Sequence, residues 1–330
     1  MNYITHVNAL IKANVADKSP LVMFGQNIAA GSCIGGLTRG LKSGGGRHVL
    51  NTPNCENTLV GTGFGLMLNG VSGIFFMKQQ DFLLLGIDQL VNTYNLVRRR
   101  KLKSSFTVFN VVVDSGYEGP QSALNNFYDF CSVARVPGYA IANKHDAEVI
   151  IQRHLVAPGF RIIGISQRLC RLDLLETPEK VVHDENGEIF QYSDGRDVTV
   201  ACFNFSFPQG QALCKDMEGR GIHPSLFSVN AMLPVDWTRI INNVRRTKKL
   251  VLVDDSKSVN GSYHHLVIAL QQELRPQRML ILTRPKDDSS ICPNADQFVI
   301  DHEQVLTQLG LTAREPARSQ APGGEVLQKA

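Results

Sequence analysis

One short stretch of the sequence places a single carboxylate at the start of a glycine-rich apolar segment. Residues 51–70 read NTPNCENTLVGTGFGLMLNG, and Glu56 is the only acidic residue among them. An acid in the first turn of a helix interacts favourably with the helix dipole, which is worth roughly 0.3–1 kcal/mol and requires no function. From these residues alone, the interaction with the helix dipole is the favoured explanation for Glu56.

Other motifs that would carry chemistry are incomplete or absent. The run Gly61-Thr-Gly-Phe-Gly65 resembles part of a dinucleotide-binding fingerprint, but residues 56–60 before it do not form the strand that this motif requires. We expect these glycines to let a helix pack closely against a second helix. The sequence has no P-loop and no nucleophile-elbow motif. His264 and His265 would point about 100° apart on a helix, and the seven cysteines form no C-x-x-C pair, so we expect no metal site in this chain.

Alternating strand and helix patterns predict the elements that position these residues. In the first part of the chain, the patterns predict strands at 21–25, 73–77, 106–113, 138–142 and 160–166, with helices at 56–68, 81–99, 123–134 and 146–156. A charged stretch at 171–196 follows, where Asn186-Gly187 predicts a short hairpin. The alternation then resumes with strands at 198–203, 225–230, 249–253 and 279–283 and helices at 209–220, 237–246 and 262–274.

This alternation predicts an α/β protein with two α/β domains rich in parallel sheet. We place the first domain at residues 1–187 and the second at 188–312, and we expect a mobile tail at 313–330. The predicted helix at 81–99 ends in Arg98-Arg99-Arg100-Lys101, where cations complement the negative end of the helix dipole. A basic cluster of this kind is also compatible with phosphate binding.

Composition narrows the class of protein. The 330 residues carry a formal charge of +4, from 34 basic and 30 acidic residues, which does not indicate nucleic-acid binding. The apolar runs, such as 106–113, are far shorter than the roughly 20 residues that cross a bilayer, so no membrane association is expected. The first residues show no secretory signal pattern, and we expect a cytoplasmic protein.

The segment from Asn51 to Gln89 resembles the β subunits of thiamine-diphosphate-dependent 2-oxo-acid dehydrogenases and, more distantly, the pyrimidine-binding half of transketolases. The matching residues are Thr52-Pro53-Asn54-Cys55-Glu56, the glycine-rich run 61–70, Phe76-Met77, Phe82 and Ile87-Asp88-Gln89. Looser similarities extend along the chain to Gly25-Gln-Asn-Ile, Val136-Pro-Gly138 and Leu233-Pro-Val-Asp236.

The resemblance implies specific roles for several residues. In this family a glutamate at the position of Glu56 meets the N1′ atom of the cofactor's aminopyrimidine and relays the proton that activates the cofactor. Phe82 matches the aromatic residue that stacks on the pyrimidine, although packing in the core is the alternative for this ring. Asn54 and Lys78 stand beside the cofactor in the same alignment.

The resemblance also implies that the chain holds only half of the cofactor site. Its relatives anchor the diphosphate and Mg²⁺ with a Gly-Asp-Gly motif, and no such motif occurs in these 330 residues. We therefore expect an α-type partner subunit that supplies this motif and the Mg²⁺ ligands, with no metal ligands in this chain. By analogy with the family, we expect an α2β2 assembly with a β–β contact.

Departures from the family pattern leave the reaction open. The histidine-containing loop of the dehydrogenases is replaced by Glu118-Gly-Pro-Gln-Ser122, so Gln121 and Ser122 become candidate contacts for a small-molecule substrate. Lys78 and Gln80 replace apolar residues, Asn54 replaces an aliphatic one, and Gln26 stands where glutamate is frequent. These changes favour a transketolase-like transfer or ligation on a polar substrate. The alternatives are a 2-oxo-acid dehydrogenase with a lipoyl partner, a non-oxidative decarboxylase and a silent regulatory or structural subunit.

Overall fold

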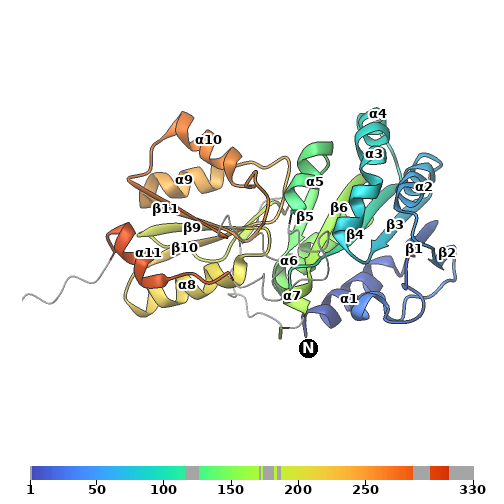
Figure 1. The fold of residues 1–330 in the computed structure, drawn as a ribbon, viewed down its shortest axis with the longest axis horizontal. Helices are drawn as coiled ribbons and strands as arrows, with labels where there is room; N and C mark the ends of the chain where they lie inside the picture. The colour runs from blue at the N-terminus through green and yellow to red at the C-terminus, as the bar shows by residue number, and fades with distance from the viewer. Residues whose placement is uncertain are drawn as a thin grey trace, which may run out of the picture.

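The chain forms two six-stranded sheets that lie side by side, each with helices packed against it (Figure 1). The computed structural model describes residues 2–115, 126–170, 172–173, 182–183, 187–284 and 298–311. Within these ranges the predicted α/β fold class is confirmed.

The first sheet is entirely parallel and has the strand order β2-β1-β3-β4-β6-β5. Its strands are β1 (Leu21–Gly25), β2 (Arg47–Asn51), β3 (Ser72–Met77), β4 (Ser105–Val112), β5 (Gly138–Ile141) and β6 (Gly159–Ser166). All residues of β4 are buried, as is typical of a parallel sheet covered on both faces.

Ten helical segments accompany this sheet in the described residues. They are α1 (Tyr3–Val15), η1 (Ile34–Gly36), α2 (Glu56–Leu68), η2 (Gln80–Gly86), α3 (Ile87–Gln89), η3 (Leu90–Tyr94), α4 (Asn95–Val97), α5 (Phe127–Ala134), α6 (Lys144–His154) and α7 (Gln167–Cys170). In Figure 1, α1, α6 and α7 lie below the sheet, and α2 to α5 lie above it.

The second sheet has the order β12-β11-β9-β10-β8-β7. Four of its strands are parallel, namely β9 (Val198–Phe203), β10 (Pro224–Val229), β11 (Lys249–Asp254) and β12 (Arg278–Thr283). The strands β7 (Val182–His183) and β8 (Ile189–Gln191) form the predicted antiparallel hairpin. The helices α8 (Phe207–Gly219) and α11 (His302–Leu309) lie on one side of this sheet, and α9 (Thr238–Thr247) and α10 (His264–Glu273) lie on the other (Figure 1).

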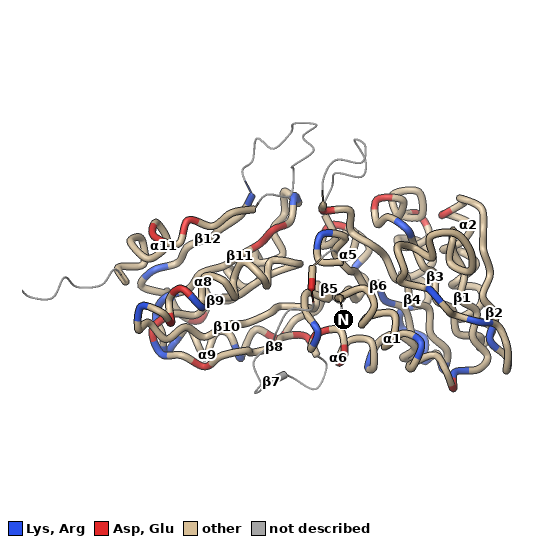
Figure 2. The backbone as a smooth tube through the Cα atoms, turned by 90° about the horizontal axis from the view of Figure 1, so that it is seen from below, with Lys and Arg blue, Asp and Glu red and all other residues tan. Residues whose placement is uncertain are grey.

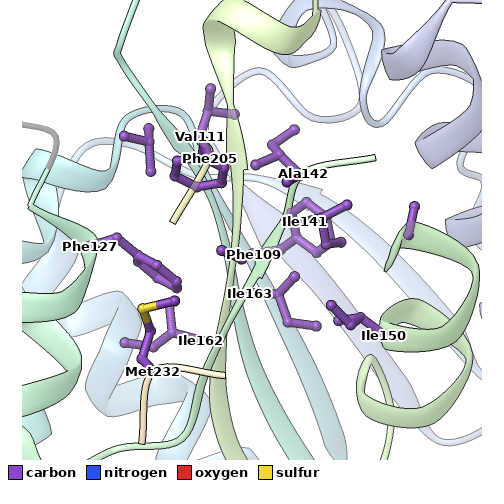
Figure 3. Close-up of a cluster of buried hydrophobic side chains, with 14 of the residues drawn as sticks. Phe109, Val111, Phe127, Ile141, Ala142, Ile150, Ile162, Ile163, Phe205 and Met232 are labelled. Atoms are coloured by element: carbon purple, nitrogen blue, oxygen red, sulfur yellow. The ribbon is translucent and has the colours of Figure 1, made fainter. Parts of the chain in front are cut away.

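The two halves share a buried apolar contact. Figure 3 shows Phe205 and Met232 from the second half among side chains of β4, β5, β6, α5 and α6. The rings of Phe127 and Phe205 have centroids 6.4 Å apart. Polar bridges cross the same contact, because Asn230 Nδ2 donates to Asp146 Oδ2 at 2.7 Å and Arg168 pairs with Asp255 at 2.6 Å.

Several elements differ from the sequence-based expectation. The predicted single helix at 81–99 is wrong, because this region consists of a 3₁₀ segment, two short α segments and a π segment. The strand β2 and the helices α1 and α11 were not predicted. The division at 187/188 remains a proposal, and β7 already pairs with β8 in the second sheet. The tail at 313–330 lies outside the described residues.

Of the two glycines in α2 that were predicted to pack closely against a second helix, Gly61 and Gly65, only Gly61 does so. A Cβ atom on Gly61 would contact the side chain of Gln89 in α3, whereas one on Gly65 would meet nothing within 4 Å. The close approach occurs at Gly63, where an added Cβ would overlap the ring of Phe106. The glycine in α2 that sets the packing distance therefore faces β4.

Basic and acidic side chains are mixed on part of the surface. Lys and Arg lie beside Asp and Glu around α8 and α9 (Figure 2). No helix among the described residues is long and apolar enough to cross a membrane. Six of the cysteines are free thiols, and Cys292 lies outside the described residues.

Candidate active site

The loop that carries Glu56 is tied to the end of a neighbouring strand. After β2, Asn51 Oδ1 accepts hydrogen bonds from the backbone N–H groups of Ile28 and Ala29 at 2.8 and 2.9 Å. Thr52 N–H donates to the Gly25 carbonyl at 3.1 Å. An added Cβ on Gly25 would overlap the carbonyl oxygen of Phe76 in β3, so only glycine allows β1 to end this close to β3. These contacts fix the loop from which α2 begins at Glu56.

Glu56, Asn54, Lys78 and Phe82, which the sequence singled out, line one hollow. Gln26 follows β1, Asn54 and Glu56 follow β2, and Lys78 follows β3. These three strands are neighbours in the order β2-β1-β3, so their carboxyl ends meet at one edge of the sheet. Ligands of open α/β sheets bind at this kind of edge.

Glu56 lines the hollow, and its carboxylate has no partner in the part of the chain that the structure describes. The residue is 8% exposed, and its carboxylate makes no hydrogen bond or ion pair with the part of the chain that the structure describes. Leu59, Phe75, Phe76 and Met77 supply apolar surface beside it. A carboxylate without a donor at the edge of a hollow can accept a hydrogen bond from a ligand.

Phe82 is held at the hollow by the irregular segment after β3. It lies in η2, and this segment ends at Gly86, where an added Cβ would be 2.9 Å from Val60 Cγ2 and 3.5 Å from the Glu56 carbonyl oxygen. The glycine thus lets η2 lie against the first turn of α2. The half-buried ring of Phe82 lies at the hollow as a result of this close approach.

A second carboxyl group beside the hollow was not identified from the sequence. Asp81 precedes Phe82 and is fully buried, and this burial raises the pKa of its carboxyl group to about 7. Asp81 does not line the hollow itself. Asp81 is the sequence neighbour of Phe82, which was the available signal, but the burial of an acid cannot be read from a pattern of residue types.

The remaining site predictions are not tested by the structure. Gln121 and Ser122 lie outside the described residues. Among the described residues, no group of three or more His, Cys, Asp or Glu side chains could hold a metal ion. His264 and His265 lie on the exposed face of α10, as expected for ordinary helix residues.

Comparison with known proteins identifies the relatives of this chain. No family model matches it. It is 23% identical over 273 residues to the pyruvate dehydrogenase E1 component subunit beta of Acholeplasma laidlawii, covering 81% of this chain and 83% of that protein. It is 25% identical over 284 residues to the 2-oxoisovalerate dehydrogenase subunit beta of Bacillus subtilis, covering 83% and 84%.

Solved structures with the same fold give a consistent result. A split-gene transketolase, determined as an inactive beta4 tetramer, has a TM-score of 0.67 at 13% identity, covering 93% of this chain and 97% of that one. The transketolase of Campylobacter jejuni has a TM-score of 0.62 at 10% identity, covering 93% of this chain but 44% of that one. The predicted fold and resemblance are thereby confirmed: the chain is similar in sequence to beta subunits of 2-oxo-acid dehydrogenase E1 components and similar in fold to transketolases.

Proposed function

We propose that this chain is the β-type subunit of a two-subunit thiamine-diphosphate-dependent enzyme, in which Glu56 activates the aminopyrimidine of the cofactor. The observation that carries the proposal is that Glu56, a largely buried residue whose carboxylate has no partner among the described residues, lines one hollow together with Phe82. The family-level cofactor of the relatives, thiamine diphosphate with Mg²⁺, agrees with this arrangement.

The residues of the hollow fit one part of that cofactor. An aminopyrimidine is a flat ring with nitrogen atoms at its edge, and the hollow offers an aromatic ring, a carboxylate acceptor and the amides of Gln26 and Asn54. The cavity in this chain is only about 10 Å³, room for a single water molecule. An aminopyrimidine therefore needs a wall that this chain does not supply.

A partner subunit is the proposed source of that wall and of the diphosphate anchor. The sequence has no Gly-Asp-Gly motif. The chain also matches nearly all of a split-gene transketolase subunit but less than half of an undivided transketolase. An α-type partner in an α2β2 assembly, with the sites at the α–β contact, would complete both the hollow and the Mg²⁺ ligands.

When bound, the cofactor would supply an acidic carbon and an electron sink for cleaving or forming a bond next to a carbonyl group. Glu56 would hold a proton between its carboxylate and the ring nitrogen it faces, and the apolar neighbours Leu59 and Phe76 would keep this proton from bulk water. Phe82 would pack on the ring and fix its orientation. Gln26 would provide a further polar contact at the edge of the hollow.

The rim of the hollow favours a polar substrate. Asn54 and Lys78 are exposed and line the opening, so they can contact hydroxyl, carbonyl or phosphate oxygens. This supports transketolase-like transfer or ligation. The second candidate, oxidative decarboxylation of a 2-oxo acid with a lipoyl partner, is supported by the names of the sequence relatives, and Lys78 could equally pair with a substrate carboxylate.

Exchange of the cofactor's C2 proton tests the role of Glu56. In the complex with its partner, Glu56→Gln should retain assembly and cofactor binding but slow this exchange, measured by NMR, by at least about 100-fold, because a glutamine cannot relay the proton. The control is Glu273→Gln, which removes an exposed acid on α10 and should leave exchange unchanged. Unchanged exchange in Glu56→Gln would assign Glu56 to the helix dipole alone.

Two further measurements address the partner and the reaction. The isolated chain should bind thiamine diphosphate no more tightly than inorganic pyrophosphate by calorimetry, and micromolar binding of thiamine diphosphate that pyrophosphate does not match would contradict the half-site. The complex should then be offered a ketose phosphate with an aldehyde, or a 2-oxo acid with an artificial electron acceptor. Turnover of the first pair supports transfer, and turnover of the second supports the dehydrogenase.

A further inference from the structure

Two adjoining hollows lie at the edge of the first sheet opposite to the edge that carries Glu56. The first hollow, of about 280 Å³, is lined at the amino ends of β4, β5 and β6 by Leu102, Pro137 and Phe160. The second, of about 440 Å³, reaches Leu233 and Pro234 in the second half of the chain. Both include Tyr94, Arg98 and Pro137, so they adjoin. We call the two together the cation pocket.

The charged residues that line the cation pocket are all basic. Arg98 and Arg100 line the first hollow, and Arg98, Arg99 and Arg135 line the second. All four are exposed, and none has an ion pair or side-chain hydrogen bond in the described part of the chain. No Asp or Glu among the described residues lines either hollow. Clustered like charges repel each other, and a bound anion would relieve that repulsion.

Arginines on α8 and α9 have a different environment. Arg245 pairs with Glu273 at 3.1 Å, Arg246 pairs with Asp194, and Arg220 pairs with Glu303 at 2.6 Å. Favourable placement at a helix end accounts for part of the cluster, since Arg98 and Arg135 follow the last residues of α4 and α5. Helix-end placement does not explain why these arginines surround hollows that no described Asp or Glu lines.

The floor of the cation pocket combines aromatic rings with a buried cation. The ring of Tyr139 stacks on His154 at 4.0 Å between centroids, and Tyr94 lies 5.3 Å from Phe160. Arg161 is 5% exposed and donates from its guanidinium to the carbonyl oxygens of His154 and Pro158 at 3.0 and 2.6 Å. Its charge therefore lies in a poorly hydrated position, where it adds to the positive potential of the pocket.

Tyr94 supplies a hydroxyl group to the same space. It is 8% exposed, and its hydroxyl has no hydrogen-bond partner among the described residues. Burial raises the pKa of this hydroxyl, the charges of Arg98 and Arg161 act in the opposite direction, and all three residues line the first hollow. A neutral hydroxyl with flanking guanidinium groups can donate to an anionic oxygen.

We propose that the cation pocket binds a small molecule carrying a phosphate or diphosphate group, with its anionic oxygens held by Arg98, Arg100 and Tyr94. Guanidinium groups match phosphate oxygens in pairs, which favours this ligand class. The space is concave and close to the size of small-molecule sites, about 300–1,000 Å³, which favours a small molecule over an acidic protein segment. The site lies at the opposite edge of the sheet from Glu56, so it is separate from the proposed cofactor site.

Calorimetry of the full chain with inorganic pyrophosphate, without Mg²⁺, tests the proposal. The double variant Arg98→Gln/Arg100→Gln should bind pyrophosphate at least about tenfold more weakly than the unaltered chain, since two charge-assisted contacts are lost. The matched control is Arg245→Gln/Arg246→Gln, which removes the same net charge at paired arginines and should leave the affinity unchanged. Tyr94→Phe should weaken binding by a smaller factor.

Defined outcomes would overturn the assignment. Equal loss in both double variants would show that net charge alone attracts the anion. Absence of pyrophosphate binding to the unaltered chain would exclude the ligand class. Binding of poly-glutamate in place of pyrophosphate, abolished by the same double variant, would show that the pocket receives an acidic protein segment. Thermal unfolding of each variant verifies that the fold is intact.

Discussion

Two glycines in the helix that begins at Glu56 should respond oppositely to the same substitution. In α2, a Cβ on Gly63 would lie 2.6 Å from Phe106 Cε1 and closer still to Cζ and Cε2, whereas a Cβ on Gly65 would meet nothing within 4 Å. Carbon atoms in contact are normally about 3.5–4.0 Å apart. Phe106 is fully buried and packs against Phe64 and Phe160, so its ring has little room to move.

The change in the free energy of unfolding of each variant is the sum of two opposing contributions. Replacing glycine by alanine inside a helix gains about 1 kcal/mol in both variants. Overpacking a filled core costs about 1–3 kcal/mol, and only Gly63→Ala incurs this cost. Gly65→Ala should thus raise the free energy of unfolding by up to about 1 kcal/mol, while Gly63→Ala should lower it by up to about 2 kcal/mol. The difference between the variants isolates the steric contribution, because the helix propensity cancels.

Urea denaturation followed by circular dichroism measures the difference. A second background, Phe106→Leu, removes the ring, and in that background Gly63→Ala should become stabilising, as Gly65→Ala is. If both alanine variants shift the urea midpoint in the same direction and by the same amount, the close packing of α2 on β4 does not constrain Gly63, and the reasoning fails.

The remaining predictions concern the buried contact between the two halves. Burial raises the pKa of Asp146 to about 6, against hydrogen bonds from Tyr192 and Asn230 that act to lower it. Because this value exceeds the roughly 3.9 of an unfolded chain, the folded state binds more protons in between, and stability should fall as pH rises from about 4 to 6. Asp146→Asn should flatten this part of the pH profile of the urea midpoint, and an unaltered slope would contradict the assignment. Arg168→Met should destabilise the protein by about 3–5 kcal/mol because it removes the guanidinium that pairs with the buried carboxylates of Asp114 and Asp255, whereas Arg220→Met, at an exposed pair, should change the melting temperature little. Equal effects of the two arginine variants would count against a buried ionic bridge.

Most strands were predictable from sequence because they are buried runs with clear ends. The predicted limits of β1 and β9 coincide with those observed, β6 begins one residue earlier than predicted, and both ends of β4 lie one residue earlier than predicted. β2 was missed because it is an edge strand with the sequence RHVLN, whose residues are exposed or half-buried and whose pattern is weak. The sequence of α1 does contain a helical pattern. Its apolar residues recur every fourth position and face the core, namely Tyr3, Val7, Ile11 and Val15.

The region after β3 could not be derived from periodicity. Leu84, Leu85 and Leu96 are exposed, so the apolar residues of 81–99 do not lie on one buried face. The close packing of Gly86 on α2 determines the local path, and this contact depends on tertiary structure. The resemblance located Phe82 correctly beside Glu56, although the predicted regular helix around it was wrong.

The residues of the candidate active site could be named from the sequence, but their meeting at one hollow could not be predicted from it. Asn54 and Glu56 lie after β2, and Lys78 lies after β3. They line one hollow because β2, β1 and β3 are neighbouring parallel strands, whose carboxyl ends lie at the same edge of the sheet. Chain order alone permits other arrangements. These 330 residues contain no Gly-Asp-Gly motif, and this absence predicts a half-site.

One segment of the chain connects the candidate active site with the cation pocket. From Lys78 and Phe82 at the carboxyl edge of the sheet, the chain runs through η2, α3, η3 and α4 to Tyr94 and Arg98 at the amino edge. Its changes between 3₁₀, α and π hydrogen bonding make it less regular than α2, against which it packs. A ligand that orders Arg98 therefore acts on the same segment that holds Phe82. Binding linkage is reciprocal, so any factor by which pyrophosphate changes the affinity of the complex for thiamine diphosphate must equal the factor by which thiamine diphosphate changes the affinity for pyrophosphate.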